Sequence, residues 1–201
     1  MALTKSQGND IEVLAANGLS IFVDDNDSEL KLKDTNGDIE PVIDFLANIT
    51  DTPLYYGSFL DTTTQTTTGG EQKAMTLNTT ILSQGISVQN NSQIKVNHAG
   101  VYNLQFSAQV VKTQGGSAQT IYIYLRKNGS NIAQTNTAFT FQNNNSYSVL
   151  AWNFVESLNA NDYLELMWYA TDNHIQIAKI SNPISGIPDI PSLIVTMNRV
   201  G

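Results

Sequence analysis

The stretch Tyr102-Asn-Leu-Gln-Phe-Ser-Ala-Gln-Val110 (YNLQFSAQV) decides the fold class of this 201-residue chain. Apolar side chains stand at every second position from Tyr102 to Val110, and polar side chains fill the positions between them. A period of two is typical of a half-buried antiparallel strand, because successive side chains point to opposite faces of the sheet. We therefore expect a long strand with one face on a core and the other face on solvent.

The same alternation recurs further along the chain, and turn residues separate its occurrences. Apolar residues alternate with polar or aromatic ones in Ile121–Leu125, Leu164–Trp168, Ile175–Ile177 and Leu193–Met197. Runs such as Lys127-Asn128-Gly129 lie between these segments, and no part of this half shows a helical period. Many strands with turns between them predict an all-β fold, an antiparallel jelly-roll sandwich.

The front of the chain is shorter in its elements, richer in turns and acidic. Its segment ELKLKDTNGDIE (residues 29–40) can be interpreted as the start of a calcium loop or as a β-hairpin. A calcium loop that began at Asp34 would need glycine at the sixth place, whereas Gly37 stands at the fourth, and Phe45 replaces the closing glutamate. The pair Asn36-Gly37 instead favours a two-residue type I′ turn. We expect a meander of three short strands over residues 19–43 and no metal site.

A domain boundary is expected at Thr52-Pro53, so that residues 1–52 form an attachment segment and residues 53–201 a jelly-roll domain. Three strands of four or five residues are too few to be stable alone in water. Their apolar side chains are therefore expected to pack against another protein. These anchor candidates are Ile21, Phe22, Val23, Leu30 and Leu32.

Composition excludes several classes of function. The net charge is −8, and Lys and Arg never cluster, which argues against a nucleic-acid partner. No apolar run reaches the length of a membrane span, and the N-terminus lacks the pattern of a secretory signal, so we expect no membrane insertion. Without cysteine there are no disulfides or thiolate ligands.

No catalytic constellation is present in the sequence. His98 and His174 lie outside known metal motifs and are expected at the solvent side. Asp162 and Glu165 are neighbouring acids near aromatic residues, but Asp162 is expected to cap a turn and Glu165 to face outward. The chain is predicted not to be an enzyme and to need no cofactor.

Three further features allow two interpretations each. The threonine-rich run 61–70 is expected to be an extended polar surface segment, with a receptor-touching loop as the alternative. Trp152 and Trp168 share faces with apolar residues, which favours the core over a sugar-stacking role. The outward aromatics Tyr122, Tyr124 and Tyr169 favour a protein interface, with cross-strand pairing inside one monomer as the alternative.

The order of features over residues 56–200 resembles the globular head of complement and tumour-necrosis-factor-like trimeric jelly rolls. The resemblance rests on Gln93–Val96, Ala99-Gly-Val-Tyr102, Arg126-Lys-Asn-Gly129, Leu158-Asn-Ala-Asn-Asp162 and the closing strand Leu193–Met197. With GIPDIPSLIVTMNRV at its end, this version is similar to those in structural proteins of tailed bacteriophages. The pieces Leu19–Val23 and Leu30–Gly37 are similar to front segments of phage head-fibre proteins.

The resemblance implies a homotrimer, with the three tyrosines near the threefold axis. It also implies a structural virion protein that decorates the capsid or forms a head fibre, is attached by its N-terminal segment and has its jelly roll facing outward. The alternative is the receptor-binding knob of a tail fibre that recognises a host surface glycan. A carbohydrate-cleaving fibre enzyme is a third reading, against which the search for paired acids argues.

Overall fold

The computed structural model describes residues 4–5, 11–14, 20–23, 30–33, 36–42, 54–181 and 184–201. The chain divides into two compact units, Met1–Pro53 and Leu54–Gly201. This division lies one residue after the boundary expected from Thr52-Pro53.

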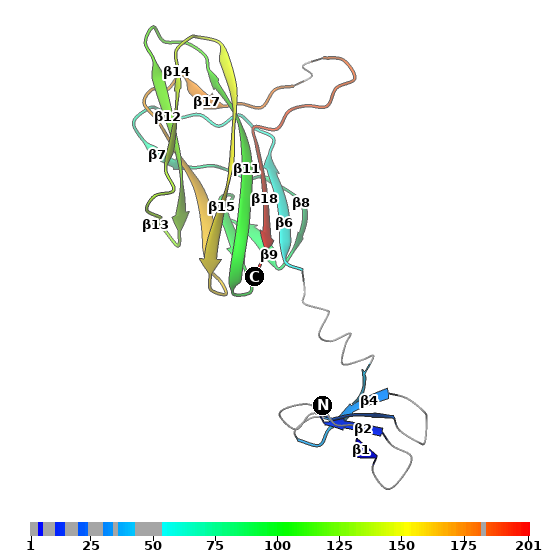
Figure 1. The fold of residues 1–201 in the computed structure, drawn as a ribbon. Coiled ribbons are helices and arrows are strands. Elements are labelled where there is room, and N and C mark those ends of the chain that lie inside the picture. Colours follow the sequence, from blue (N-terminus) through cyan, green and yellow to red (C-terminus); the bar gives the residue numbers. More distant parts are fainter. Residues whose placement is uncertain are drawn as a thin grey trace. The chain divides into compact units, whose positions relative to one another are not determined.

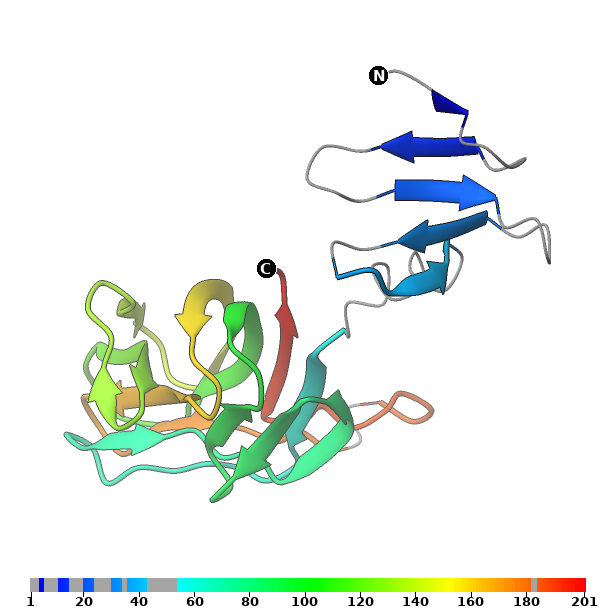
Figure 2. The ribbon, with the colours of Figure 1, turned by 90° about the horizontal axis from the view of Figure 1, so that it is seen from below.

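The first unit is an antiparallel sheet whose strands follow one another in chain order. They are β1 (Thr4–Lys5), β2 (Ile11–Leu14), β3 (Ser20–Val23), β4 (Leu30–Lys33) and β5 (Ile39–Pro41), as Figure 2 shows. The three strands predicted over residues 19–43 correspond to β3, β4 and β5. The prediction missed β1 and β2, because Asn9, Asp10 and Glu12 interrupt the apolar pattern there.

The hairpin between β4 and β5 differs in detail from the predicted one. Within the described residues the pairing ends with Lys33 and Ile39, and five residues lie between β4 and β5 instead of two. Gly37 has a φ of +95°, in the left-handed region. With Lys33 opposite Ile39, a two-residue turn at Asn36-Gly37 does not fit the register of the strands, and the prediction of that turn was therefore wrong.

The anchor candidates in the first unit differ in how exposed their side chains are. Leu32 is buried within the sheet, where it pairs with Ile21 of β3 and with Glu40 of β5, so its side chain is not presented to a partner. Leu30 is 49% exposed and keeps the surface that an anchor needs. The side chains of Ile21, Phe22 and Val23 lie outside what the structure describes.

The second unit is a sandwich of two antiparallel sheets (Figure 1). Sheet I has the order β13-β12-β16-β10-β9, with β14 also paired to β12 and β7 also paired to β16. Its strands are β7 (Gln72–Ala74), β9 (Ile86–Gln89), β10 (Gln93–Val96), β12 (Gln119–Lys127), β13 (Ser130–Asn131), β14 (Thr137–Phe141) and β16 (Tyr163–Ala170).

Sheet II has the order β15-β11-β18-β6-β8, with β17 also paired to β11. Its strands are β6 (Tyr56–Asp61), β8 (Thr79–Gln84), β11 (Gly100–Lys112), β15 (Ser146–Leu158), β17 (Ile175–Ile177) and β18 (Leu193–Arg199). Figure 1 shows β11, β18 and β6 side by side in this sheet. The all-β jelly-roll sandwich predicted from the alternation is confirmed.

The core between the sheets is built from the residues that the alternation selects. In β11 the positions Tyr102, Leu104, Phe106, Ala108 and Val110 are all buried. The apolar positions of the other predicted strands join the same core, namely Ile121, Ile123, Leu125, Leu164, Leu166, Ile175, Ile177, Leu193, Val195 and Met197.

Both tryptophans contribute to this core. Trp168 is fully buried, as expected. Trp152 is half-buried and packs edge-on against Phe106, with ring centroids 4.6 Å apart. The prediction that they are core residues is confirmed for Trp168, and for Trp152 in the weaker sense that it covers the margin of the core.

The second face of β16 is not solvated, contrary to the prediction. Met167 and Glu165 are both buried. The carboxylate of Glu165 tolerates burial because the Ser92 hydroxyl donates a 2.9 Å hydrogen bond to its Oε1. Ser92 belongs to the turn between β9 and β10, a neighbour that alternation within one strand cannot reveal.

Between β8 and β9 the chain passes from one sheet to the other through a single residue, Gly85. β8 of sheet II ends at Gln84, and β9 of sheet I begins at Ile86. Gly85 has a φ of +68°, and a Cβ atom there would collide with the ring of Tyr55. Glycine therefore meets both the conformational and the steric requirement of this corner.

The threonine-rich run is an extended segment, but it is not wholly on the surface. Gln65 and Thr67 are buried, and Gln65 forms an isolated bridge with Ile177. At its start, the buried Asp61 accepts hydrogen bonds from the Thr63 amide at 2.7 Å and from the Thr76 hydroxyl at 2.7 Å. Side chains within the run and beside it therefore hold it against the sandwich.

Asp162 caps the turn before β16, as predicted. Lys127 Nζ lies 2.9 Å from its Oδ2, Asn128 Nδ2 donates to Oδ1 at 2.7 Å, and the Asn159 amide donates to Oδ2 at 2.8 Å. These contacts, the Lys127 ammonium first, lower the pKa of Asp162 from 3.8 to about 2. The turn is therefore held by a carboxylate that stays ionised to low pH.

We expect Asp162→Asn to lower the free energy of unfolding by about 1 kcal/mol at neutral pH, after allowance for solvent screening. Because the folded pKa lies below the unfolded value, this contribution is fully present above about pH 4 and is lost as the pH falls toward 2. Urea unfolding measured between these pH values would show the effect. Equal pH dependence of the two proteins would contradict the assignment.

Candidate functional site

The three predicted tyrosines lie together on sheet I. Tyr122 and Tyr169 are directly paired across β12 and β16, and their rings meet edge to face with centroids 5.9 Å apart. Both side chains are half-buried. Tyr124 is only 9% exposed, so the expectation that its side chain faces solvent was wrong. The pairing of Tyr122 with Tyr169 is the cross-strand alternative raised by the sequence.

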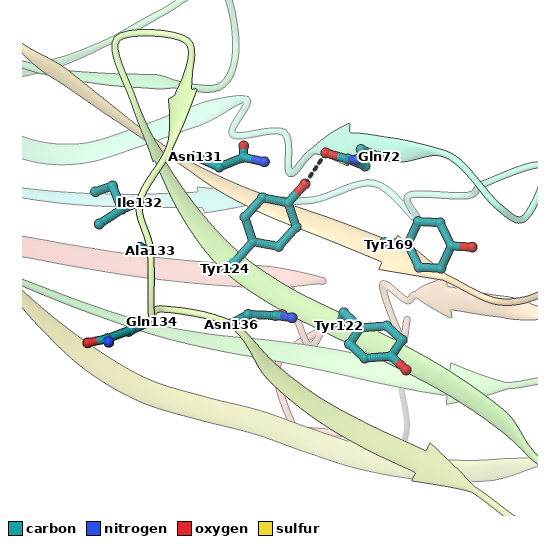
Figure 3. Close-up of a pocket in the computed structure, with 9 residues that line it drawn as sticks. All are labelled: Gln72, Tyr122, Tyr124, Asn131, Ile132, Ala133, Gln134, Asn136 and Tyr169. Carbon is teal, nitrogen blue, oxygen red and sulfur yellow. Dashed lines mark hydrogen bonds between the residues drawn. The ribbon is translucent and has the colours of Figure 1, made fainter.

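A pocket of about 360 Å³ opens beside these tyrosines (Figure 3). One wall comes from β12, β16 and β7, and the other from the connection between β13 and β14. The lining residues are Gln72, Tyr122, Tyr124, Asn131, Ile132, Ala133, Gln134, Asn136 and Tyr169. Among the residues that the structure describes, no charged side chain lines the pocket, whose lining consists of aromatic rings, amides and two aliphatic side chains.

The connection between β13 and β14 is held in place by its own hydrogen bonds. The Ile132 amide donates to the Leu125 carbonyl at 2.9 Å. The Thr135 hydroxyl accepts from the Leu125 amide at 3.0 Å and donates to the Ile132 carbonyl at 2.9 Å. Gln134 sits at the bend with a φ of +65°. This wall of the pocket is therefore tied to β12 and not a free loop.

The hydroxyl of Tyr124 is fixed by a neighbour. It donates a 2.6 Å hydrogen bond to Gln72 Oε1, drawn as a dashed line in Figure 3. Burial raises the pKa of Tyr124 above its ordinary value of 10.0, although the nearby Arg126 opposes the shift. The hydroxyl thus stays protonated, and Gln72 and Tyr124 form a rigid floor. Arg126 itself points its Nε to Asn131 Oδ1 at 3.3 Å.

The sequence could not identify the pocket as a whole. Alternation placed Tyr122, Tyr124 and Tyr169 on one face of neighbouring strands. The amide residues of the second wall lie in an irregular segment with no periodicity, and Gln72 belongs to a three-residue strand. A run of residues rich in Asn and Gln after a hairpin was the only signal, and such runs occur throughout this chain.

A second surface feature lies on the opposite sheet. The outward face of sheet II carries the exposed apolar side chains Tyr147, Val149, Val155, Ile194 and Leu82, which we call the outer apolar face. Val149 is 55% exposed, Val155 58% and Ile194 40%. The pairing Ala151–Ser107–Ile194 places β15 and β18 residues on one side of the sheet. Exposed apolar rows of this kind mark interaction surfaces.

The acids and histidines weighed in the sequence do not form a site. Asp162 and Glu165 are each engaged as described above. His98 is exposed, as predicted, and stacks on Tyr55 with centroids 4.1 Å apart, whereas His174 is half-buried and bonds Asp172. Within the described ranges, no three His, Asp or Glu side chains gather in a way that could hold a metal ion. In those same ranges no helix is both long and apolar enough to cross a membrane.

Comparison with solved structures identifies the fold of the second unit. No protein-family model and no curated protein sequence matches the chain. Among solved structures, Eiger TNF from S. frugiperda matches with a TM-score of 0.54 at 10% identity, over 74% of this chain and 94% of that one. The jelly roll has a tumour-necrosis-factor-like fold. Murine APRIL at pH 8.5 also matches, at 9% identity and a TM-score of 0.47, over 74% of this chain and all of the other.

Proposed function

We propose that the chain is a structural virion protein of a tailed bacteriophage that forms a homotrimer. It decorates the capsid or forms a head fibre, the first unit attaches it, and the jelly roll faces outward. The proposal is supported by the separation of the chain into two units and by the tumour-necrosis-factor-like fold of the second unit. It is also supported by the resemblance of the jelly-roll half to structural proteins of tailed bacteriophages and of the front segment to phage head-fibre and fibre-like proteins.

The observation that carries the trimer is the outer apolar face. Its five side chains lie on regular strands of one sheet and leave apolar area in water that a second and third copy would cover. The pocket tyrosines, which the sequence favoured for this role, expose less of their surface. We therefore assign the interface to the outer apolar face, and the tyrosine interface stays a prediction that the same experiments test.

The trimer has a direct test. Sedimentation of the full-length protein at micromolar concentration is expected to give about three times the 22.0 kDa mass of one chain. An obligate interface should bury more than about 2,000 Å² in total. A stable monomer at this concentration would contradict the proposal.

The attachment also has a test that separates two locations. Labelled antibody against the jelly roll is expected to mark the capsids of intact particles. Label confined to the tail tip would instead favour the second candidate, a receptor-binding knob that recognises a host surface glycan. The neutral aromatic pocket on sheet I is the observation that favours this second candidate.

A further inference from the structure

The described lining of the pocket on sheet I combines aromatic rings with side-chain amides and includes no charged side chain. It presents the rings of Tyr122, Tyr124 and Tyr169 together with four primary amides, and it contains no charge. Its volume of about 360 Å³ lies at the lower end of the range of small-molecule sites, about 300–1,000 Å³. The pocket therefore suits a small, neutral and polar ligand.

The rings and amides match the two surfaces of a sugar. A pyranose ring has faces of C–H groups, which pack on aromatic rings, and a rim of hydroxyls that both donate and accept hydrogen bonds. Tyr122 and Tyr169 are half-buried and meet at an interplanar angle of 61°, so they form a bent apolar surface. The amide of Asn136, which points toward Tyr122 in Figure 3, offers a donor and an acceptor.

Other ligand classes fit less well. An acidic sugar or a phosphate would lack a free counter-charge, because none of the described lining side chains is cationic and the neighbouring Arg126 is engaged by Asn131. An apolar peptide anchor would find only Ile132 and Ala133 as aliphatic contacts. We propose that this pocket binds one neutral sugar residue, a hexose or N-acetylhexosamine.

The site is preorganised for such a ligand. The Tyr124–Gln72 hydrogen bond fixes the floor, and the bonds of Thr135 and Ile132 fix the second wall. Binding therefore costs little ordering of the protein. The proposal does not rest on trimer formation or on attachment to particles, because the pocket lies on sheet I and the outer apolar face on sheet II.

The test uses the full-length protein and defined sugars. Saturation-transfer NMR with methyl glucoside, methyl galactoside and N-acetylglucosamine at millimolar concentration is expected to show binding of at least one of them. Glucuronic acid serves as the charged probe and is expected to bind more weakly. Tyr122→Ala and Asn136→Ala should each weaken the binding sugar about tenfold.

Ile184→Ala is the control, because Ile184 is 64% exposed in the connection between β17 and β18 and belongs neither to the pocket lining nor to the outer apolar face. It should leave sugar binding unchanged. Thermal unfolding confirms that each variant is folded, and Asn136→Ala keeps the test decisive if Tyr122→Ala proves unstable. The proposal is overturned if no neutral sugar binds, if glucuronic acid binds better than the neutral sugars, or if the pocket variants bind as well as the control. A monomeric protein that binds sugar would contradict the trimer and leave the site intact.

Discussion

A shortened chain of residues 53–201 is expected to fold and trimerise like the full protein but to be lost from phage particles. The second unit contains both sheets and the whole sandwich core, so removal of the first unit takes away none of the core contacts of the jelly roll. The first unit has strands of two to four residues and leaves Leu30 exposed. Such a sheet gains its stability from a partner surface.

The measurement is co-sedimentation with particles that lack the native copy. Full-length protein should pellet with the particles, and residues 53–201 should stay in the supernatant. Equal thermal unfolding of the jelly roll in both proteins serves as the folding control. If both proteins pellet equally, the jelly roll carries the attachment surface and the role of the first unit is wrong. Substitution Leu30→Glu in the full chain should weaken pelleting, whereas Leu32→Glu should first destabilise the sheet that buries it.

The double variant Val149→Glu and Ile194→Glu is expected to convert the trimer to monomers. Both side chains are exposed on the outward face of sheet II, so a single chain tolerates the change. In a trimer the new carboxylates would be buried without partners, and three copies would bring like charges together. Each uncompensated buried charge costs several kcal/mol.

Sedimentation of the double variant measures the effect directly. Ile184→Glu is the control, because Ile184 is exposed outside the sheets, in the connection between β17 and β18, and its substitution should leave the trimer unchanged. A double variant that remains trimeric would remove the outer apolar face as the interface. In that case the trimeric state of Tyr122→Glu would decide whether the tyrosines form the interface.

The parts of the fold that sequence reasoning predicted are those where one strand determines its own pattern. In β11 the alternation from Tyr102 to Val110 gives the buried face without reference to any neighbour. The prediction that Glu165 faces outward was wrong for the opposite reason. Its burial depends on Ser92, which is 73 residues away in the chain. The prediction of a two-residue turn at Asn36-Gly37 was wrong because the local residue pair does not determine the loop length on its own. The register between β4 and β5 also determines it.

The candidate site was predictable only in part for the same reason. Tyr122, Tyr124 and Tyr169 were identified because strand periodicity placed them on one face. Whether such aromatics cover a partner or line a pocket depends on what lies above them. That cover comes from Ile132–Asn136, an irregular segment whose path is set by hydrogen bonds to Leu125 and by the φ of Gln134.

The position of β18 constrains the order in which the protein can be made. β18 is the last strand of the jelly roll in the sequence, yet it lies between β11 and β6 in the middle of sheet II. Until Leu193–Arg199 has left the ribosome, β6 has no neighbour on that side, and β11 cannot complete its ladder. Pairing of β18 with β6 closes a loop of most of the domain, and folds dominated by such distant contacts form slowly, in about milliseconds to seconds. Sheet II therefore cannot complete its pairing until β18 has been synthesised, and the proposed trimer can form only after that step.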